Sequence, residues 1–473
     1  MNKCPYCQNL IEEHWLYCRA CNKPLITNLK DALDRSIKFP YDKPEIYHLE
    51  VEEQSDVFND VVIEDKEIDE KIKEIDQALE SKEIAGAPIP GSLLVEKSSL
   101  YYKKRDLPKA LKNLELAIKN FEEENDLINL AICHNEIGII HEDNGFFDQA
   151  IYHFNRSLEI LKDINDIHKI IKVLNNLGNI YFLINDLEQS YHFYQKAFKL
   201  SKQENLEFEE IKSSSNLVEV LYLLKDFNRI KKILARNSEF FKENEDIYGI
   251  IQTEIKYGKL YFIMGEDYDE SYQHLNIALE LINKLSENIS LYIKAKLEWE
   301  CYLYLGKIYR VRDNSTKAED YFIRSLESVR IFEIRDNIKE GEILENIAEL
   351  YLFKGESEKS IEYYELSGEI YYKFGDNVKN AENKFKRGKI YLEFEENITK
   401  AMNYFEEALE IYEDLEYSKE SATILHKLGD IYVNEGMVET AVSYFERAQD
   451  YYQKIQDDYN TKLLNEKIRS LSN

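Results

Sequence analysis

Hydrophobic residues recur with a helical period along most of this chain, and a fixed pattern of small and aromatic residues recurs with them. The stretch from Leu174 to Leu200 shows the pattern once, on both sides of a break in the hydrophobic period. Its members are, in order, Gly178, Tyr181, the break at Asn185-Asp186, Ser190, Tyr194 and Ala197. A helical period that stops and resumes within so few residues predicts two amphipathic helices joined by a turn.

The first small position of this pattern recurs in nine units, at steps of 40, 40, 40, 40, 48, 42, 40 and 41 residues. Its occupants are Ser98, Gly138, Gly178, Val218, Gly258, Gly306, Ala348, Gly388 and Gly429. Three positions later stands a tyrosine in seven units, whereas His141 and Leu221 stand there in the second and fourth. The tyrosines are Tyr101, Tyr181, Tyr261, Tyr309, Tyr351, Tyr391 and Tyr432. Such regularity predicts a repeat protein.

Two further small positions follow in the second helix of each unit except the fourth. The second position holds Ala110, Ala150, Ser190, Ser271, Ala318, Ser360, Ala401 and Ala441, and the third holds Ala117, Ser157, Ala197, Ala278, Ser325, Ser367, Ala408 and Ala448. Small residues on two antiparallel helices let the helices approach closely, and the tyrosine fills the space beside them. Because each pair leaves an apolar face that the next pair covers, the units are expected to stack into a solenoid.

The pentapeptide Leu177-Gly178-Asn179-Ile180-Tyr181 resembles the motif of the tetratricopeptide repeat, in the longer form, of about 40 residues, seen in kinesin light chains and Leu-Gly-Asn repeat proteins. The proline that the family carries at the end of the second helix is absent here, consistent with a longer second helix. The resemblance implies an all-α, right-handed superhelical solenoid of about nine antiparallel helix pairs.

The repeats are predicted to occupy residues 91–457, and residues 458–473 fit a terminal helix that caps the open end of the stack. Residues 26–90 contain four prolines after residue 39, and residues 41–90 carry sixteen acidic against five basic side chains. We therefore predict an acidic linker in which residues 63–79, with apolar residues at helical spacing, form one helix. A solvated tether and a segment that folds back onto a basic groove both remain open for this linker.

The N-terminal residues 1–25 contain two Cys-x-x-Cys motifs separated by ten residues: Cys4, Cys7, Cys18 and Cys21. Two such motifs supply four thiolates, the ligand set of a closed tetrahedral zinc site. The segment resembles the short zinc ribbons found at the N-terminus of many bacterial and archaeal proteins, although Gln8 stands where those ribbons usually have glycine. We predict a structural Zn²⁺ ion, because four thiolates leave no open coordination position for catalysis.

Composition narrows the classes of partner. The formal net charge is −29, which disfavours nucleic acid and anionic membranes as partners. No apolar run is long enough to cross a bilayer, and the N-terminus lacks an apolar signal segment, so a cytoplasmic location is expected. No phosphate-binding loop, nucleophile elbow or His-Glu-x-x-His motif is present, which predicts a protein without enzymatic activity. His134 and His141 are interpreted as packing residues, and Cys133 and Cys301 as buried small hydrophobes.

The resemblance also implies which residues face the groove of the solenoid. In tetratricopeptide repeats the first helix of each pair lines the concave side, at positions −3, +1 and +4 from the small residue. Transferred to this chain, and with Lys256 added beside them, these positions name Asn135, Asn175, Asn179, Phe182, Lys256, Lys259, Phe262, Lys307, Arg310 and Lys389. Asparagine amides can clamp a peptide backbone, and basic side chains can receive carboxylates. Acidic residues hold the +1 position in three other units, so an ordinary mixed-charge groove remains the alternative.

These observations favour a protein-protein interaction scaffold that holds a peptide or helix, with acidic groups or a C-terminal carboxylate, in the concave groove. The zinc ribbon would be an accessory docking module. The alternative is a regulatory protein whose zinc ribbon contacts nucleic acid while the repeats sense a partner or ligand. No motif in the sequence identifies the partner or the oligomeric state of this chain.

Overall fold

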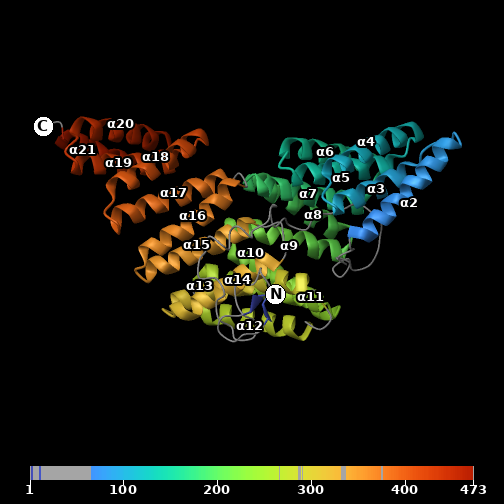
Figure 1. Cartoon of the computed structure of the whole chain (residues 1–473), viewed down its shortest axis with the longest axis horizontal. Helices are drawn as coiled ribbons and strands as arrows, with labels where there is room; N and C mark the ends of the chain where they lie inside the picture. Colours follow the sequence, from blue (N-terminus) through green and yellow to red (C-terminus); the bar gives the residue numbers. More distant parts are fainter. Residues whose placement is uncertain are drawn as a thin grey trace. The chain divides into compact units, whose positions relative to one another are not determined.

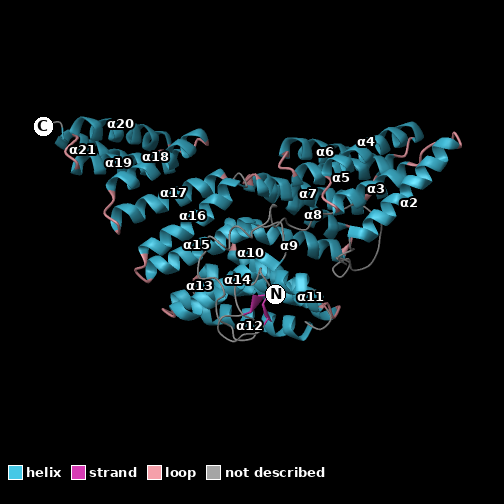
Figure 2. Cartoon of the chain, in the orientation of Figure 1, coloured by secondary structure: helices cyan, strands magenta, loops and turns pink. Residues whose placement is uncertain are grey.

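The computed structural model of this chain describes residues 2–3, 10–11, 65–265, 267–285, 289, 291–331, 337–373 and 376–471 (Figure 2). Strands β1 (Asn2–Lys3) and β2 (Leu10–Ile11) form an antiparallel pair. All other regular structure in these residues is helical. Cys4, Cys7, Cys18 and Cys21 lie outside the described residues, so the zinc ribbon stays a prediction.

Within the described ranges the helices alternate between two roles, A and B, as the sequence pattern predicts. The A helices are α3 (Gly91–Lys103), α5 (Leu127–Asp143), α7 (Ile167–Leu183), α9 (Glu207–Leu223), α11 (Ile247–Met264), α13 (Leu291–Val311), α15 (Asn337–Phe353), α17 (Asn377–Glu393) and α19 (Ser418–Asn434). The B helices are α4 (Leu107–Glu124), α6 (Phe147–Ile164), α8 (Leu187–Gln203), α10 (Phe227–Glu243), α12 (Tyr268–Leu285), α14 (Ser315–Ile331), α16 (Ser357–Lys373), α18 (Ile398–Asp414) and α20 (Val438–Lys454).

Each A helix packs against the B helix that follows it, α11 and α12 meeting at Gly258 and Leu275, and most B helices pack against the next A helix (Figure 1). The chain divides by its contacts into two compact units, one of residues 43–281 and one that contains residues 282–473. We call them the N-terminal unit and the C-terminal unit. In each unit, contacts run mainly between neighbours along the chain, which is the arrangement of a solenoid.

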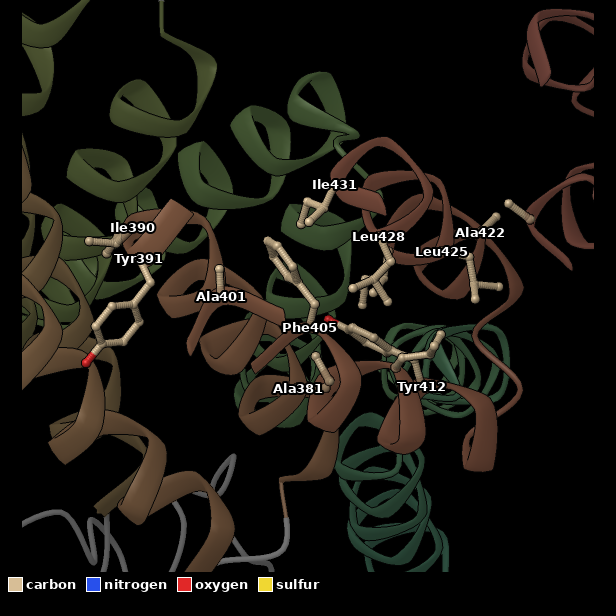
Figure 3. Packing of buried hydrophobic residues seen from close by; sticks show 14 of the residues in the cluster. Ala381, Ile390, Tyr391, Ala401, Phe405, Tyr412, Ala422, Leu425, Leu428 and Ile431 are labelled. Carbon is tan, nitrogen blue, oxygen red and sulfur yellow. The ribbon is translucent and has the colours of Figure 1, made fainter. Parts of the chain in front are cut away.

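The close approach within each helix pair comes from a small residue on helix A lying against a large one on helix B. A Cβ atom at Gly138 would lie 2.7 Å from Cδ1 of Phe154, and one at Gly178 would lie 2.5 Å from Cδ1 of Tyr194. Gly306, Gly388 and Gly429 meet Phe322, Phe405 and Phe445 in the same way. Figure 3 shows Phe405 in the C-terminal unit, with its ring directed toward Ile431. The small residues that the sequence singles out are thus confirmed as packing positions.

Serine at five of the six described small positions of helix B adds a hydrogen bond to helix A, whereas the buried hydroxyl of Ser360 has no hydrogen-bond partner. The Ser190 hydroxyl donates to the carbonyl oxygen of Gly178 at 2.9 Å, and Ser271 donates to that of Gly258 at 2.6 Å. At the third small position, serine donates to a carbonyl oxygen that lies about two turns before the small residue of helix A, as Ser157 does to Ala131 at 2.8 Å. A buried hydroxyl that is satisfied in this way costs little stability, so either serine or alanine can occupy these positions.

The tyrosine of helix A stacks on a second ring from helix B. Tyr181 stacks on Phe193 with ring centroids 5.3 Å apart, and Tyr309 on Tyr321 at 5.4 Å. The same pairing recurs for Tyr261–His274, Tyr351–Tyr363, Tyr391–Tyr404 and Tyr432–Tyr444. His141 takes the tyrosine's place in the second repeat and stacks on His153, which itself lies beside His134. Both histidines named in the sequence therefore pack between α5 and α6.

The turns between helices use one recurring device. Most helices are followed by a residue of positive φ, such as Asn125, Asn185 or Gly145, and then by a residue that caps the next helix. Aspartate is the usual cap: Asp126 accepts from the backbone amide of Asn129, and Asp186 from that of Gln189. A residue in the left-handed conformation ends one helix, and a side-chain oxygen caps the next. The chain therefore reverses direction within a few residues.

Two further helices cover the ends of the stack. Helix α2 (Asp65–Ile84) packs Ile68, Ile72 and Ile75 against Leu100 of α3. Helix α2 overlaps the helix expected at residues 63–79 and extends to Ile84. Helix α21 (Asp458–Leu471) buries Leu464 against α20, within the range where a terminal cap is expected. In the fourth repeat, Ile230 and Asn237 replace the two small residues of helix B, and both are buried.

Candidate interaction surfaces

The A helices form the inner layer of each unit. Successive A helices contact each other directly at α3–α5 and α7–α9 in the N-terminal unit and at α13–α15 in the C-terminal unit. Polar contacts between side chains 35 to 41 residues apart in sequence join further A helices, as described below. In a curved stack of helix pairs the layer with the closest neighbours lies on the concave side. The residues proposed for the groove all lie on A helices.

The three asparagines proposed to clamp a peptide are instead buried within that layer. Asn135, Asn175 and Asn179 have no exposed surface. Asn175 donates to the Ser213 hydroxyl at 3.0 Å, and Asn179 accepts from the Tyr194 hydroxyl at 2.7 Å. Asn135 accepts from the amide of Asn176 at 2.9 Å. The expected role in peptide binding is thus corrected: because these amides join neighbouring helices, they are not presented to a ligand in this structure.

The basic residues of the fifth repeat are paired with an acidic residue of the fourth. Nζ of Lys256 lies 2.6 Å and Nζ of Lys259 lies 3.0 Å from the carboxylate of Glu219. Burial alone would raise the pKa of Glu219, but the two ammonium groups outweigh it and lower the pKa to about 2. Lys259 also lies over the Tyr222 ring, 4.7 Å from its centroid. This cluster is therefore neutralised in part and does not form a free basic patch.

Charge alternates from one A helix to the next in the C-terminal unit. Lys307 and Arg310 of α13 pair with Glu342 and Glu349 of α15. The next A helix, α17, returns Lys386 to the same acidic helix, where it contacts Glu345 and Glu349. Lys467 of α21 pairs with Asp430 of α19. The A helices of this unit thus carry charges of both signs that pair with one another.

The remaining proposed groove residues have different surroundings. Phe182 is half-buried and packs against the hydrophobic cluster around Leu217 and Leu221. Phe262 is half-buried and lies 5.5 Å from the Tyr268 ring, measured between centroids. Lys389 is half-buried and forms no ion pair with any described residue. Of the basic residues proposed, Lys389 is thus the one whose charge faces no carboxylate in the part of the chain that is described.

A surface that the sequence analysis missed lies at the turns between helix A and helix B. In eight of the nine described repeats a large apolar residue at or just after the end of helix A is between 36% and 58% exposed. We call these residues the turn row: Phe146, Ile184, Leu224 and Ile263 in the N-terminal unit, and Val311, Phe353, Phe394 and Met437 in the C-terminal unit. Their spacing follows the repeat, which was the signal available in the sequence, but exposure cannot be read from hydrophobicity alone.

Two hollows accompany the turn row of the C-terminal unit. One, of about 420 Å³, lies between the ends of α13 and α15 and is lined by Arg310, Val311, Asp313, Glu349 and Phe353. The other, of about 500 Å³, lies between the α17–α18 turn and the α19–α20 turn. Both are open to solvent, so they could receive a side chain from a partner rather than enclose a small molecule.

The histidines and cysteines named from the sequence lie within the helix layers. Nδ1 of His134 lies 3.0 Å from Nδ1 of His153, and burial lowers the pKa of each to about 4. Cys133 and Cys301 are buried, as expected. Among the described residues no group of three or more His, Cys, Asp or Glu side chains is arranged to hold a metal ion. None of the helices in those residues is long and apolar enough to cross a membrane.

Comparison with protein families identifies the repeats. The family model described as tetratricopeptide repeat matches residues 171–204 and 341–376, which cover most of α7 and α15 and all of α8 and α16. The family model described as soluble NSF attachment protein matches residues 394–472, which contain α18 to α21. The chain therefore carries tetratricopeptide repeats. No match was found among curated proteins.

Several solved structures are similar in fold at low sequence identity. The apo form of the quorum sensor NprR from B. thuringiensis is 16% identical, covers 83% of this chain and 99% of its own, and has a TM-score of 0.48. A Rap protein complexed with Competence and Sporulation Factor is 13% identical, with 78% and 99% covered and a TM-score of 0.48. A signal-transduction ATPase from Pyrococcus horikoshii with a tetratricopeptide repeat sensor is 15% identical, with 86% and 56% covered and a TM-score of 0.47.

Proposed function

We propose that this chain is a non-enzymatic protein-protein interaction scaffold whose repeats hold a peptide or helix of another protein. The turn row carries this proposal. Packing within the repeats does not require a large exposed apolar residue at each A–B turn, yet eight of the nine described repeats have one. Each unit carries four of these exposed apolar residues, one near each of four successive A–B turns, and their burial by a partner would drive association.

The inner layer of A helices would add specificity rather than most of the affinity. Its charged side chains already pair with each other, as Lys256 and Lys259 do with Glu219. A partner with carboxylates would have to compete with Glu219 for these ammonium groups, and the exchange would give little net energy. Lys389, which has no ion pair among the described residues, is the position where an acidic group or a C-terminal carboxylate of the partner would be received.

The experiment compares affinity capture from a native lysate of the source organism by the wild-type chain and by three matched double variants. Ile184→Ser/Leu224→Ser and Val311→Ser/Phe353→Ser change the turn row of each unit. Tyr152→Ser/Ile277→Ser is the control, because these apolar residues are as exposed but lie on B helices. We expect a specific partner to be retained by the wild type and the control and lost by at least one turn-row variant. Equal capture by all four chains would contradict the proposal.

We also propose that Cys4, Cys7, Cys18 and Cys21 hold a structural Zn²⁺ ion and that this segment docks a protein. The support is the ligand set itself and the antiparallel pair β1–β2, whose strands lie on either side of Cys4 and Cys7 in sequence. Metal analysis of the purified chain should find about one zinc equivalent, lost in Cys7→Ser and kept in Cys133→Ala. A chain that folds with no bound metal would contradict this part.

A further inference from the structure

The turns of the last two repeats form a surface that differs from the rest of the turn row. The hollow of about 500 Å³ between the α17–α18 and α19–α20 turns has an apolar lining from four side chains. These are Ile398, Met402, Tyr432 and Met437. Met437 is 54% exposed at its mouth, and Phe394 beside the α17–α18 turn is 52% exposed. Methionine side chains adapt their shape to a bound apolar group, so this lining suits a large side chain from a partner.

The rim of the hollow is acidic. Glu395, Glu396 and Glu435 line it. The two turn segments, residues 393–400 and 434–439, contain five carboxylates and a single basic residue, Lys400. Lys400 points elsewhere, because its Nζ lies 4.9 Å from the centroid of the Tyr391 ring. Within the described part of the chain, none of the five carboxylates forms an ion pair, in contrast to the paired acidic residues of the A helices.

We infer that this hollow docks a basic amphipathic segment of a partner protein, in which a large apolar side chain is flanked by lysine or arginine. The inference rests on the proposed scaffold function and specifies the chemistry of one partner surface. The apolar residue of the partner would enter between Met437 and Ile398 while the flanking cations meet the unpaired carboxylates of the rim. Apolar burial supplies affinity and the complementary charges supply rate and selectivity. An acidic partner is disfavoured at this surface, because its charge would face Glu395, Glu396 and Glu435.

The test measures binding of fluorescein-labelled peptides to the full chain by fluorescence anisotropy. The first peptide alternates pairs of lysine and leucine, the second has glutamate in place of lysine, and the third has serine in place of leucine. We expect the wild-type chain to bind the first peptide and neither of the others. Added salt should weaken the binding, because the rim carboxylates are exposed to solvent.

Variants separate this hollow from the general acidity of the protein. Ile398→Ser/Met437→Ser and Glu396→Lys/Glu435→Lys should each weaken binding of the first peptide by roughly tenfold. The control Glu410→Lys/Asp450→Lys makes the same charge change at exposed positions of α18 and α20 and should leave binding unchanged. Circular dichroism of each variant confirms that it is folded. Equal loss in the control would show that net charge alone attracts the peptide and would overturn the inference.

Other outcomes are also decisive. If the first peptide does not bind while capture from lysate still depends on the turn row, the inference is wrong and the scaffold function stands. If both fail, the scaffold function itself is contradicted. If Ile398→Ser/Met437→Ser changes the sedimentation of the chain from an oligomer to a monomer, the hollow is occupied by a second copy of the chain, and the inference is overturned in that way.

Discussion

At the scale of single residues, the fold depends on pairs in which one partner must be small because the other is large. Gly138 and Gly178 leave no room for a Cβ atom beside Phe154 and Tyr194. The fourth repeat shows the complementary solution, because Val218 takes the glycine's place and Leu234 takes the aromatic's place, and both are buried in the same cluster. Packing density is thus kept by exchanging volume between two positions.

This exchange predicts that a destabilising substitution can be repaired from the facing helix. Gly138→Val should lower the free energy of unfolding by about 1–3 kcal/mol, because the new side chain overlaps Phe154. Adding Phe154→Leu should recover part of that loss by reproducing the Val218–Leu234 pair. Denaturant unfolding of both single variants and the double variant gives the coupling energy, expected at roughly 0.5–3 kcal/mol. Additive losses would mean that the two positions do not share one space.

The sequence predicted the small and aromatic positions well because their spacing repeats nine times. It could not predict the surroundings of Asn175 and Asn179, since a position counted from the small residue fixes a helical face but not the depth of burial. Their partners, Ser213 and Tyr194, lie on neighbouring helices, and no local pattern announces such a pairing. The turn row was missed for the related reason that apolar residues at helix ends are as often covered as exposed.

At the scale of elements, helices that are neighbours in the inner layer are joined by polar contacts between residues 35 to 41 apart in sequence. Asn176 reaches Asn135, Lys259 reaches Glu219, and Lys307 reaches Glu342. The first two contacts join equivalent or nearly equivalent positions of successive repeats, whereas Glu342 lies about two turns before the position equivalent to Lys307. A basic residue on one A helix is therefore paired with an acidic residue on the next. This pairing explains why the basic residues of several repeats do not form a basic groove.

The Glu219 contact predicts a pH-dependent contribution to stability. The pKa of this carboxyl is about 2 in the folded chain and below its ordinary value of 4.5. The unfolded chain therefore binds the proton more tightly, so the stabilisation is fully present above pH 4.5 and is lost as the pH falls toward 2. Glu219→Gln should lower the free energy of unfolding on the order of 1 kcal/mol at pH 7, because Lys256 and Lys259 lose their carboxylate.

Urea unfolding at a series of pH values checks this prediction. The difference between wild type and Glu219→Gln should shrink steadily below pH 4.5, because the unfolded wild-type chain then binds a proton at this carboxyl that the folded chain does not bind until about pH 2. Glu243→Gln, at an exposed position near the end of α10, is the matched control and should show no such gap at any pH. A gap that stays constant down to pH 2 would show that the loss comes from packing and not from charge.

At the scale of the whole molecule, most contacts join helices that are close to each other along the chain. Each described helix meets mainly its neighbours along the chain, and the contacts fall into two units of residues 43–281 and 282–473 apart from the N-terminal segment. The repeat period predicted the number and order of these pairs from sequence, whereas the division into two units could not be predicted, because it depends on where the interlocking weakens. In such a stack stability is a sum of local terms and neighbour terms.

This organisation predicts that damage stays local. A valine at position 429 would overlap Phe445, whose Cε1 atom lies 2.4 Å from the expected Cβ position. In Gly429→Val, hydrogen exchange should therefore accelerate in α19 and α20 and in their neighbours α18 and α21, while residues 65–281 keep the protection of the wild type. Gly178→Val, the matched change in the N-terminal unit, should give the reverse distribution, because its Cβ would overlap Tyr194. Exchange measured by mass spectrometry on both variants resolves the two regions. Faster exchange throughout both units in either variant would show that the chain unfolds as one cooperative body, and the description as two separate stacks of neighbour contacts would then be wrong.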